Sequence, residues 1–370
     1  MALKVLQTPA ELPSLRDPWN QLVERSLENI PFLTYDWLSA WWRAFAGDRQ
    51  MHLVTAWRNG ALCGLAPLVY TTKKRFGRRR QILSLWANEH TNRTNFVIAK
   101  EGADEVVSAM LEHLISDAPR WDLLELGHLD AGSAATSVLL ETLRAKNVAF
   151  GTEESIRSPY LRLPSNVDEV MAGLSSSFRQ TLRRKVRKAK KAGDITVEAV
   201  GSTARLEDVL AISRDTWQHG DGTSIASTET LERFYSELAA NMAAHGWLQL
   251  AFLRRAGESI CFEYNLVYNN KLYNLKLGYR PELEHISPGL VLKYHLLEQL
   301  MGTGVREYDF LGADEHYKLQ WSKTVRQHYK VLVFNKRPDL YAIHFALYRA
   351  RPFLRRYAPT LFQLKKRFGL

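Results

Sequence analysis

The alternation of apolar and polar positions predicts two β-hairpins far apart in the chain. Residues 52–70 contain two strand-like runs joined by an Arg-Asn-Gly turn, and residues 247–266 contain two more, joined at Gly257. Glycine between such runs is typical of a hairpin because it tolerates positive φ. Strands of this kind, mixed with helical segments, indicate an α/β protein.

Both predicted hairpins occur in the same order of elements. A helical segment that contains Trp or Tyr precedes each hairpin, at 35–45 and at 228–245. A strand, a helix and a strand follow each hairpin, at 81–86, 103–116 and 121–127 and again at 271–277, 289–301 and 306–311. The repeated order predicts two related mixed α/β halves.

The expected domain division places the first half at 1–157 and the second at 158–336. The second half begins with a helix at 166–191 that is broken near 173–177, and Gly193 gives it a C-terminal signal. Residues 337–370 are expected to form a basic helical extension, interrupted at Pro352 and Pro359 because proline removes a helical N–H donor.

The bulk composition is typical of a globular protein of two domains. The 370 residues are 46% hydrophobic and 24% charged, and no apolar run approaches the ~20 residues of a membrane span. The first residues lack a basic segment followed by an apolar one, so no secretory leader is expected. Cys63 and Cys261 lie in apolar runs and are expected to be free and buried. We expect a cytoplasmic protein, with peripheral contact at the inner membrane as a further possibility.

The formal net charge of +11 suggests a polyanionic partner, depending on where the cations lie. One basic cluster lies at 73–80, in an expected loop. A second lies on the helix at 179–191, and a third follows Asp339, the last acidic residue. The third mixes apolar and basic residues, as interfacial helices do, so we expect either contact with an anionic membrane surface or packing on its own domain. Sequence-specific DNA binding is not expected, because no helix-turn-helix or zinc-finger pattern accompanies the charge.

Residues 276–298 form the segment richest in candidate chemistry. A strand leaves through a polar loop and enters a helix, with Ser287 as N-cap, Pro288 at the first helical position and Gly289 next. Free N–H groups at such a helix start can bind a phosphate. The alternative is simply a well-capped helix, and neither a P-loop nor a G-x-G-x-x-G pattern is present.

A second segment brings Asp309, Gly312, Tyr317, Lys318 and Trp321 close together after a predicted strand. Ligands often collect at strand ends in α/β sheets, although Tyr317 and Trp321 are also spaced for core packing.

Three other patterns bear on the chemistry that we expect of the protein. The polar loop at 86–95 is expected to be solvated, with acceptor binding as the alternative. The 11 histidines show no metal-ligand spacing, so no metal is expected. No G-x-S-x-G elbow is present, which argues against a serine hydrolase.

Together, Ser287-Pro-Gly, Asp309-Phe-Leu-Gly312, Tyr317-Lys318 and Trp321 resemble the C-terminal signature of CelD/BcsL-type (BioF2-like) acetyltransferases. These are a bacterial branch of the GNAT superfamily, related to the Fem-type peptidyltransferases. The basic helix at 178–191 is similar to the arginine-rich helix that opens the family's second half. The resemblance implies tandem GNAT-like folds, with a degenerate first half and a catalytic second half that binds an acyl thioester. In place of the GNAT pyrophosphate-loop pattern, only His285, Ser287, Pro288 and Gly289 are present.

The resemblance also implies roles for particular residues. Backbone N–H groups would polarise the thioester carbonyl. A carboxylate would take the proton that the acceptor loses, and a phenol would protonate the thiolate. Lys318 and the arginines of the basic helix would suit a phosphate. The expected catalytic candidates are Glu263, Tyr264, Asp309, Tyr317 and Lys318. The expected donor-binding residues are Lys276, Leu277, Gly278, Tyr279, Ser287, Pro288, Gly289 and Tyr294. The expected substrate-binding residues are Arg179, Arg183, Arg184 and Trp321. For Glu263 the alternative is a structural ion pair with a neighbouring Lys or Arg.

The expected function is transfer of an acyl group from acetyl-CoA or a longer acyl-CoA to an amine or hydroxyl. The resemblance implies an exopolysaccharide or cell-envelope precursor, a glycan or peptide, as the acceptor. Two alternatives stay open: Fem-like aminoacyl transfer from charged tRNA, and a binding protein with a decayed site that works in envelope assembly. A monomer is expected, because the two halves of one chain could pair with each other in the way that two single GNAT domains often pair in a dimer.

Overall fold

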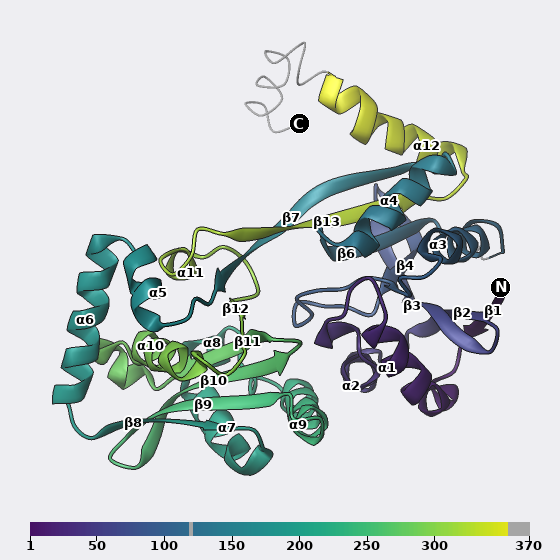
Figure 1. Ribbon diagram of the computed structural model, residues 1–370. Coiled ribbons are helices and arrows are strands. Elements are labelled where there is room, and N and C mark those ends of the chain that lie inside the picture. The colour runs from purple at the N-terminus through teal and green to yellow at the C-terminus, as the bar shows by residue number, and fades with distance from the viewer. Residues whose placement is uncertain (118–120, 354–370) are drawn as a thin grey trace. The chain divides into compact units, whose positions relative to one another are not determined.

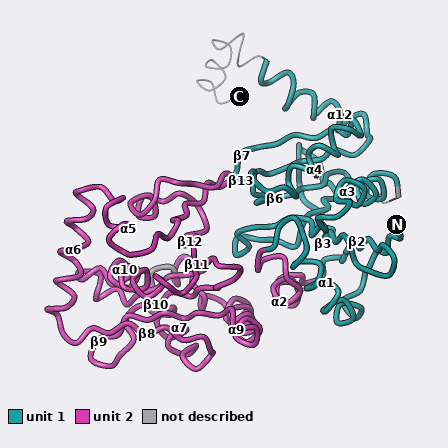
Figure 2. The backbone as a smooth tube through the Cα atoms, in the orientation of Figure 1, with its two compact units in different colours: residues 1–29, 48–155, 328–370 teal, residues 30–47, 156–327 magenta. Residues whose placement is uncertain are grey.

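The computed structural model describes residues 1–117 and 121–353, and its elements are labelled in Figure 1. The chain divides into two compact units (Figure 2). The first unit contains residues 1–29, 48–155 and those from 328 onward, and the second contains residues 30–47 and 156–327.

The sheet of the first unit has the strand order β1, β2, β3, β4, β6, β13, β7, with β5 beside β3. Its strands are β1 (Ala2–Leu6), β2 (Gln50–Arg58), β3 (Ala61–Arg75), β4 (Arg78–Leu85), β5 (Val97–Ile98), β6 (Leu123–Asp130), β7 (Phe150–Arg162) and β13 (Val325–Phe334). Asn59 and Gly60 join β2 to β3 with φ of 52° and 78°. This mirror-image turn matches the right-handed twist of the strands and confirms the first predicted hairpin.

Helices pack on this sheet through small or apolar side chains. They are α1 (Arg16–Glu24), α3 (Ala103–Glu112), α4 (Ala134–Ala145) and α12 (Pro338–Phe345), with the short turns η1 (Pro9–Leu15), η3 (His113–Asp117) and η6 (Ala346–Ala350). Gly64 on β3 lets α3 approach closely, because a Cβ there would lie 2.4 Å from Val106.

The basic cluster at 73–80 lies on strands β3 and β4 and the tight turn between them, so the expectation of a loop was wrong. The two strands pair as far as Arg75 and Arg78. Acidic partners neutralise part of the cluster: Arg75 donates to Glu125 at 3.0 Å, and Arg80 donates to Asp339 at 2.7 Å. The charge here is therefore partly structural.

The sheet of the second unit has the order β7, β12, β11, β10, β9, β8, so β7 contributes residues to both units. The remaining strands are β8 (Ile195–Val200), β9 (Leu248–Arg255), β10 (Glu258–Tyr268), β11 (Lys271–Tyr279) and β12 (Glu307–Asp309). Ala256 and Gly257 join β9 to β10 with φ of 47° and 82°, which confirms the second hairpin.

The two units share one plan. In each, an antiparallel meander ends in a strand that is parallel to its next neighbour, β4 to β6 in the first unit and β11 to β12 in the second. A helix connects each parallel pair, α3 in the first unit and α10 (Pro288–Leu300) in the second. The shared topology confirms the predicted internal repeat, and the fold of each unit is mixed α/β.

Helices cover both faces of the second sheet. They are α2 (Tyr35–Phe45), α5 (Val167–Gly173), α6 (Ser176–Lys191), α7 (Leu206–Asp215), α8 (Trp217–Gly220), α9 (Glu229–Ala244) and α11 (His316–Leu319), with the short turns η2 (Pro31–Leu33), η4 (Thr203–Arg205) and η5 (Pro281–Ile286). Glu263 on β10 contacts Lys293 of α10, whereas its neighbour Tyr264 contacts Tyr235 of α9. Since successive strand residues point to opposite faces, α10 and α9 cover opposite sides. The break between α5 and α6 confirms the predicted interruption near 173–177.

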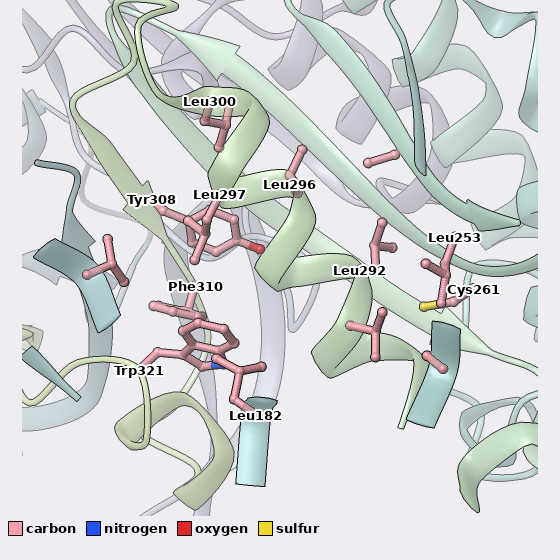
Figure 3. Close-up of a cluster of buried hydrophobic side chains, with 14 of the residues drawn as sticks. Leu182, Leu253, Cys261, Leu292, Leu296, Leu297, Leu300, Tyr308, Phe310 and Trp321 are labelled. Carbon is pink, nitrogen blue, oxygen red and sulfur yellow. The ribbon is translucent and has the colours of Figure 1, made fainter. Parts of the chain in front are cut away.

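The core on the α10 side of this sheet is drawn in Figure 3. Leu292, Leu296 and Leu297 of α10 belong to this cluster together with Leu253 and Cys261 of the strands. Trp321 belongs to the same cluster and lies edge-on to Phe178, with ring centroids 5.3 Å apart. Cys63 and Cys261 are both free and buried, as predicted.

Helix α2 lies in the second unit, although the sequence groups it with the first half. Trp37 packs edge-on against Phe234 of α9, with ring centroids 5.9 Å apart. Asp36 lies 3.0 Å from His245 Nε2, and Arg43 Nε donates to Glu237 at 2.8 Å. These long-range contacts attach α2 to α9.

The predicted C-terminal extension lies in the first unit as far as it is described. Leu340 is fully buried and packs with Ile82, Leu123, Leu332 and Phe334. The basic residues Arg355, Arg356, Lys365, Lys366 and Arg367 lie outside the described residues. Within 1–117 and 121–353, no helix combines the length and apolar character that crossing a bilayer requires.

Candidate active site

Strands β11 and β12 separate after a short parallel pairing. Lys271, Leu272 and Tyr273 pair with Glu307, Tyr308 and Asp309. Strand β12 ends at Asp309 while β11 continues to Tyr279. Beyond Tyr273, among the described residues, β11 therefore has a strand partner only on its β10 side. Backbone N–H groups alternate between the two sides of a strand, so some of those on β11 after Tyr273 point away from β10.

A β-bulge lies where the strands separate. In the pairing of β10 with β11, Tyr264 faces Lys276 and Asn265 faces Asn274, so Leu275 has no partner. A bulge leaves an extra residue unpaired and re-aims the backbone. The predicted donor segment, Lys276 to Tyr279, begins directly after the bulge.

Helix α10 begins beside this segment. Ser287 takes the N-cap position in a left-handed conformation, φ 57° and ψ 59°, and its hydroxyl makes no capping hydrogen bond. Its carbonyl instead accepts from the N–H groups of Leu290 and Val291, at 3.1 and 3.2 Å. A Cβ on Gly289 would lie 3.2 Å from Leu277, so glycine here allows close packing of α10 on β11. The structure thus brings Lys276–Tyr279 and Ser287–Gly289 together.

Glu263, a predicted catalytic carboxylate, lies in a buried network. Its Oε1 lies 2.7 Å from Lys293 Nζ, and its Oε2 accepts from the Tyr308 hydroxyl at 2.7 Å. Lys293 also contacts the Tyr308 oxygen. Asn265 donates to Oε2 at 3.4 Å, and Asn274 at the bulge donates to Asn265 at 2.8 Å. This arrangement matches the alternative reading of Glu263 as a paired structural carboxylate.

Burial controls ionisation in this network. It lowers the pKa of the Lys293 ammonium, while the neighbouring Glu263 opposes the shift. It also raises the pKa of Tyr308 well above the ordinary value for a phenol. A buried charge is stable only when paired and hydrogen-bonded, so these groups hold one another in place. Sequence reasoning missed Lys293, although its spacing with Leu296, Leu297 and Leu300 places a lysine on the apolar stripe of the helix.

Asp309, the other predicted carboxylate, is fully buried and ion-paired. Its Oδ2 accepts from Arg326 at 2.9 Å, and its Oδ1 accepts from the Leu311 N–H at 3.0 Å. Arg326 also donates to Glu307 at 2.7 Å and lies over the Tyr160 ring, 4.0 Å from the centroid. Asp309 thus ties the end of β12 to β13.

The predicted phenols differ in accessibility. Tyr264 is fully buried and donates to the Tyr235 carbonyl at 3.0 Å, so it faces the core. Tyr317 is 52% exposed. Tyr279 and Tyr294 are partly buried. Burial, helped by a hydrogen bond with Glu298, raises the pKa of Tyr294 to about 12, so this phenol keeps its proton at neutral pH.

Lys318 holds the loop that follows β12. Its Nζ donates to the carbonyls of Leu311 and Ala313 at 2.7 and 3.2 Å and lies 2.7 Å from Glu315. Leu311 and Gly312 have φ of 52° and 58°, and this left-handed pair turns the chain around the ammonium. The buried lysine therefore fixes the loop that carries Tyr317.

A basic groove lies between α6 and α10. Its volume is about 790 Å³, and its lining includes Arg183, Arg184, Arg187 and Tyr294. Helix α6 contains no acidic residue. A second hollow of about 390 Å³ is lined by Lys190 of the same helix and by His295 and Glu298 of α10. The groove thus brings Arg183 and Arg184 together with Tyr294, whereas Arg179 donates to the carbonyls of Met171 and Ala172 at the end of α5.

The polar loop at 86–95 is buried in the first unit over much of its length, so the expectation of a solvated loop was wrong. Asn95 is fully buried and donates to Glu28 at 2.9 Å, and Ser133 donates to the same oxygen at 2.7 Å. Burial raises the pKa of Glu28, and the two hydrogen bonds oppose this shift. Ser133 is also the N-cap of α4, so the loop joins α4 to the segment after α1.

Among the described residues, no group of three or more His, Cys, Asp or Glu side chains could hold a metal ion.

Residues 176–319 match the family model described as an acetyltransferase (GNAT) domain. This range begins with α6 and ends with α11, so it includes the separated strands, the bulge and α10. None of the curated proteins matches the chain significantly.

Solved structures resemble the whole chain. FemX is 13% identical, with 93% of this chain and 100% of that chain covered and a TM-score of 0.62. L-PGS from Bacillus licheniformis is 10% identical, with 92% and 95% covered and a TM-score of 0.54. At such identities the likeness shows the fold alone, and it extends over both units. Residues 176–319 thus match a GNAT acetyltransferase domain, and the protein is an enzyme of the acyltransferase class.

Proposed function

We propose that the protein transfers an acyl group from an acyl-CoA thioester to an amine or hydroxyl acceptor. The observation that carries the proposal is the separation of β11 from β12 at a bulge, directly beside the start of α10. An acyl thioester supplies the activated carbonyl. Acetyl-CoA and longer acyl-CoA molecules are both candidate donors.

The backbone of β11 would polarise the thioester carbonyl. Pairing with β10 holds the strand after the bulge in place, so the N–H groups on its other side would need no reorganisation to stabilise negative charge on the oxygen. The start of α10 adds the positive end of a helix dipole for the donor's phosphates. Gly289 keeps this helix start close to β11.

Proton transfer would use groups outside the buried ion pairs. The acceptor's nitrogen or oxygen forms a bond to the carbonyl carbon while the C–S bond breaks. The acceptor loses a proton and the departing thiolate gains one. Tyr294, Tyr279 and Tyr317 can each present a protonated phenol to the thiolate. Glu263 and Asp309 are already ion-paired, so we assign the acceptor's proton to water rather than to either carboxylate.

The acceptor is proposed to be a cell-envelope or exopolysaccharide precursor, on the CelD/BcsL-type resemblance of the sequence. The first unit repeats the plan of the second and is proposed to help bind this glycan or peptide. We propose that a single copy of the chain, which carries both units, is the working form of the enzyme.

The basic groove favours a second candidate donor, an aminoacylated RNA. Arg183, Arg184 and Arg187 line one side of it on a helix without acidic residues. One arginine guanidinium can donate to two oxygens of a phosphate at once. The ring of Tyr294 could stack on a base.

Calorimetric titration with acetyl-CoA, a long-chain acyl-CoA and an aminoacylated RNA minihelix tests both candidates. The matched variants are Ser287→Asp and Ser287→Asn, since both side chains tolerate the left-handed conformation and only Asp adds negative charge. We expect wild-type protein to bind a thioester, Ser287→Asp to lose at least about tenfold in affinity (~1.4 kcal/mol) and Ser287→Asn to bind nearly as wild type. A folded wild-type protein that binds neither thioester would overturn the acyl-CoA proposal, and tight binding of the minihelix would then support the RNA donor.

A further inference from the structure

The helix that ends the described chain has apolar side chains on two faces. Helix α12 and η6 continue as helix through Phe353, and Figure 1 draws these turns as one helix (yellow). The inward face packs on the sheet of the first unit through Leu340, Ile343, Leu347 and Tyr348. An ordinary surface helix would be polar on the opposite face.

Aromatic side chains instead occupy the outward face. Tyr341 is 42% exposed, Phe345 62% and Phe353 61%. Three of the six exposed large hydrophobic residues in the described chain therefore lie on this one helix. Since isolated exposed apolar residues are ordinary, it is their concentration that needs an explanation.

The inward contacts fix the orientation of the helix. His344 Nε2 lies 3.0 Å from the Phe150 carbonyl, and the Tyr348 hydroxyl donates to Glu153 at 2.9 Å. Gly151 provides the space for this contact, because a Cβ there would lie 2.2 Å from the Tyr348 ring. The outward exposure of Phe345 is therefore built into the way the helix is attached.

Arg349 lies on the same helix as these aromatic residues, and the sequence after Asp339 is basic. Asp339 is the last acidic residue of the sequence, and the segment after it contains Arg349, Arg351, Arg355, Arg356, Lys365, Lys366 and Arg367. Aromatic rings and arginines on one face are the combination that suits the headgroup region of a membrane, where rings enter the interface and cations meet anionic lipids.

We propose that the outward face of this helix, defined by Tyr341, Phe345, Arg349 and Phe353, docks on the surface of an anionic lipid bilayer. The aromatic rings enter the boundary between headgroups and acyl chains, and Arg349 contacts lipid phosphates. The helix lies along the surface and does not cross it. This inference is independent of the acyl donor, and it would place an acyltransferase beside membrane-linked acceptors.

Co-sedimentation of the full chain with vesicles tests the proposal. The vesicles contain phosphatidylglycerol mixed with phosphatidylcholine, or phosphatidylcholine alone. We expect binding to the anionic vesicles only, weakened by salt, and a loss of at least about tenfold in the Tyr341→Ser/Phe345→Ser variant. Arg349→Glu should weaken binding as well. Phe76→Ser removes a 41% exposed aromatic residue elsewhere on the first unit and should bind as wild type.

Two further measurements separate loss of lipid binding from unfolding of the variants and from self-association of the chain. Thermal unfolding of each variant checks that the substituted side chains, being exposed, leave the fold intact. Sedimentation velocity checks whether the face joins two copies of the chain. Equal vesicle binding by the double variant and wild type would overturn the proposal, as would a concentration-dependent dimer that Tyr341→Ser/Phe345→Ser dissociates.

Discussion

Lys293 on α10 and Glu263 on β10 form an ion pair with 2.7 Å between Nζ and Oε1, and both side chains are buried. The pair connects the helix that begins at the proposed donor site to the central strand beneath it. Two charges in an apolar core are tolerated because each satisfies the other, with Tyr308 and Asn265 completing the hydrogen bonds of Glu263.

Lys293→Met should destabilise the protein severely. The substitution leaves the Glu263 carboxylate buried without its cation, at a cost of about 3–5 kcal/mol in the free energy of unfolding. Urea denaturation measures this change in the free energy of unfolding. The double variant Glu263→Met/Lys293→Met should recover part of the loss, because no lone charge remains buried. A single variant as stable as wild type would show that the ion pair contributes nothing.

Charge reversal in the basic groove should weaken donor binding. We expect Arg183→Glu/Arg187→Glu to lower the affinity for the donor that binds by about tenfold or more, because carboxylates would replace two phosphate partners. The residual binding should depend less on salt. The double variant Arg49→Glu/Arg79→Glu, at two exposed arginines of the first unit, is the charge-matched control. Equal loss in both variants would indicate only a general effect of net charge.

His52 should make the protein less stable in acid. Burial, together with the charge of His113, whose ring is stacked with its centroid 6.2 Å away, lowers the pKa of His52 to about 4. Because the folded pKa lies below the ordinary 6.5, the unfolded chain binds this proton first. The stability contribution is complete above pH 6.5 and is lost as the pH falls toward 4, by up to about 3 kcal/mol.

Phe at position 52 removes this titration. The difference in free energy of unfolding between pH 7 and pH 4.5 should therefore be smaller in His52→Phe than in wild type, as measured by denaturant titration at both pH values. His316→Phe, at an exposed position, should leave the difference unchanged. If this difference is as large in His52→Phe as in wild type, His52 is not the group that makes the protein less stable in acid.

Gly278→Ala should disturb β11 next to the bulge. The added Cβ would lie 2.5 Å from Cε1 of Phe262 on the neighbouring strand, and such overpacking costs about 1–3 kcal/mol. Gly173→Ala at the end of α5 meets no atom within 4 Å and should be neutral or slightly stabilising. Thermal unfolding compares the two. A Gly278→Ala variant with a wild-type melting temperature would show that Phe262 moves aside freely.

Local signals in the sequence were enough to predict much of the second unit's framework. Gly257 marked a hairpin, and Gly173 to Ser177 marked the break between α5 and α6, because turns and helix ends depend on a few adjacent residues. The same local pattern repeated in order predicted two related α/β halves. The sequence also assigned Lys276–Tyr279 and Ser287–Gly289 to one expected donor site, and the packing of Gly289 on Leu277 brings the two segments together.

Contacts between distant residues decided the rest. The sequence alone determined the order of elements and the basic, acid-free character of α6. Only the tertiary structure paired Glu263 with Lys293, 30 positions apart, attached α2 to α9 through Trp37 and Phe234, and left Leu275 unpaired at the bulge. Local propensity acts over one or two turns of chain, whereas an ion pair, an aromatic contact or a strand register depends on which distant segment packs against it, and that is settled only when the core is assembled.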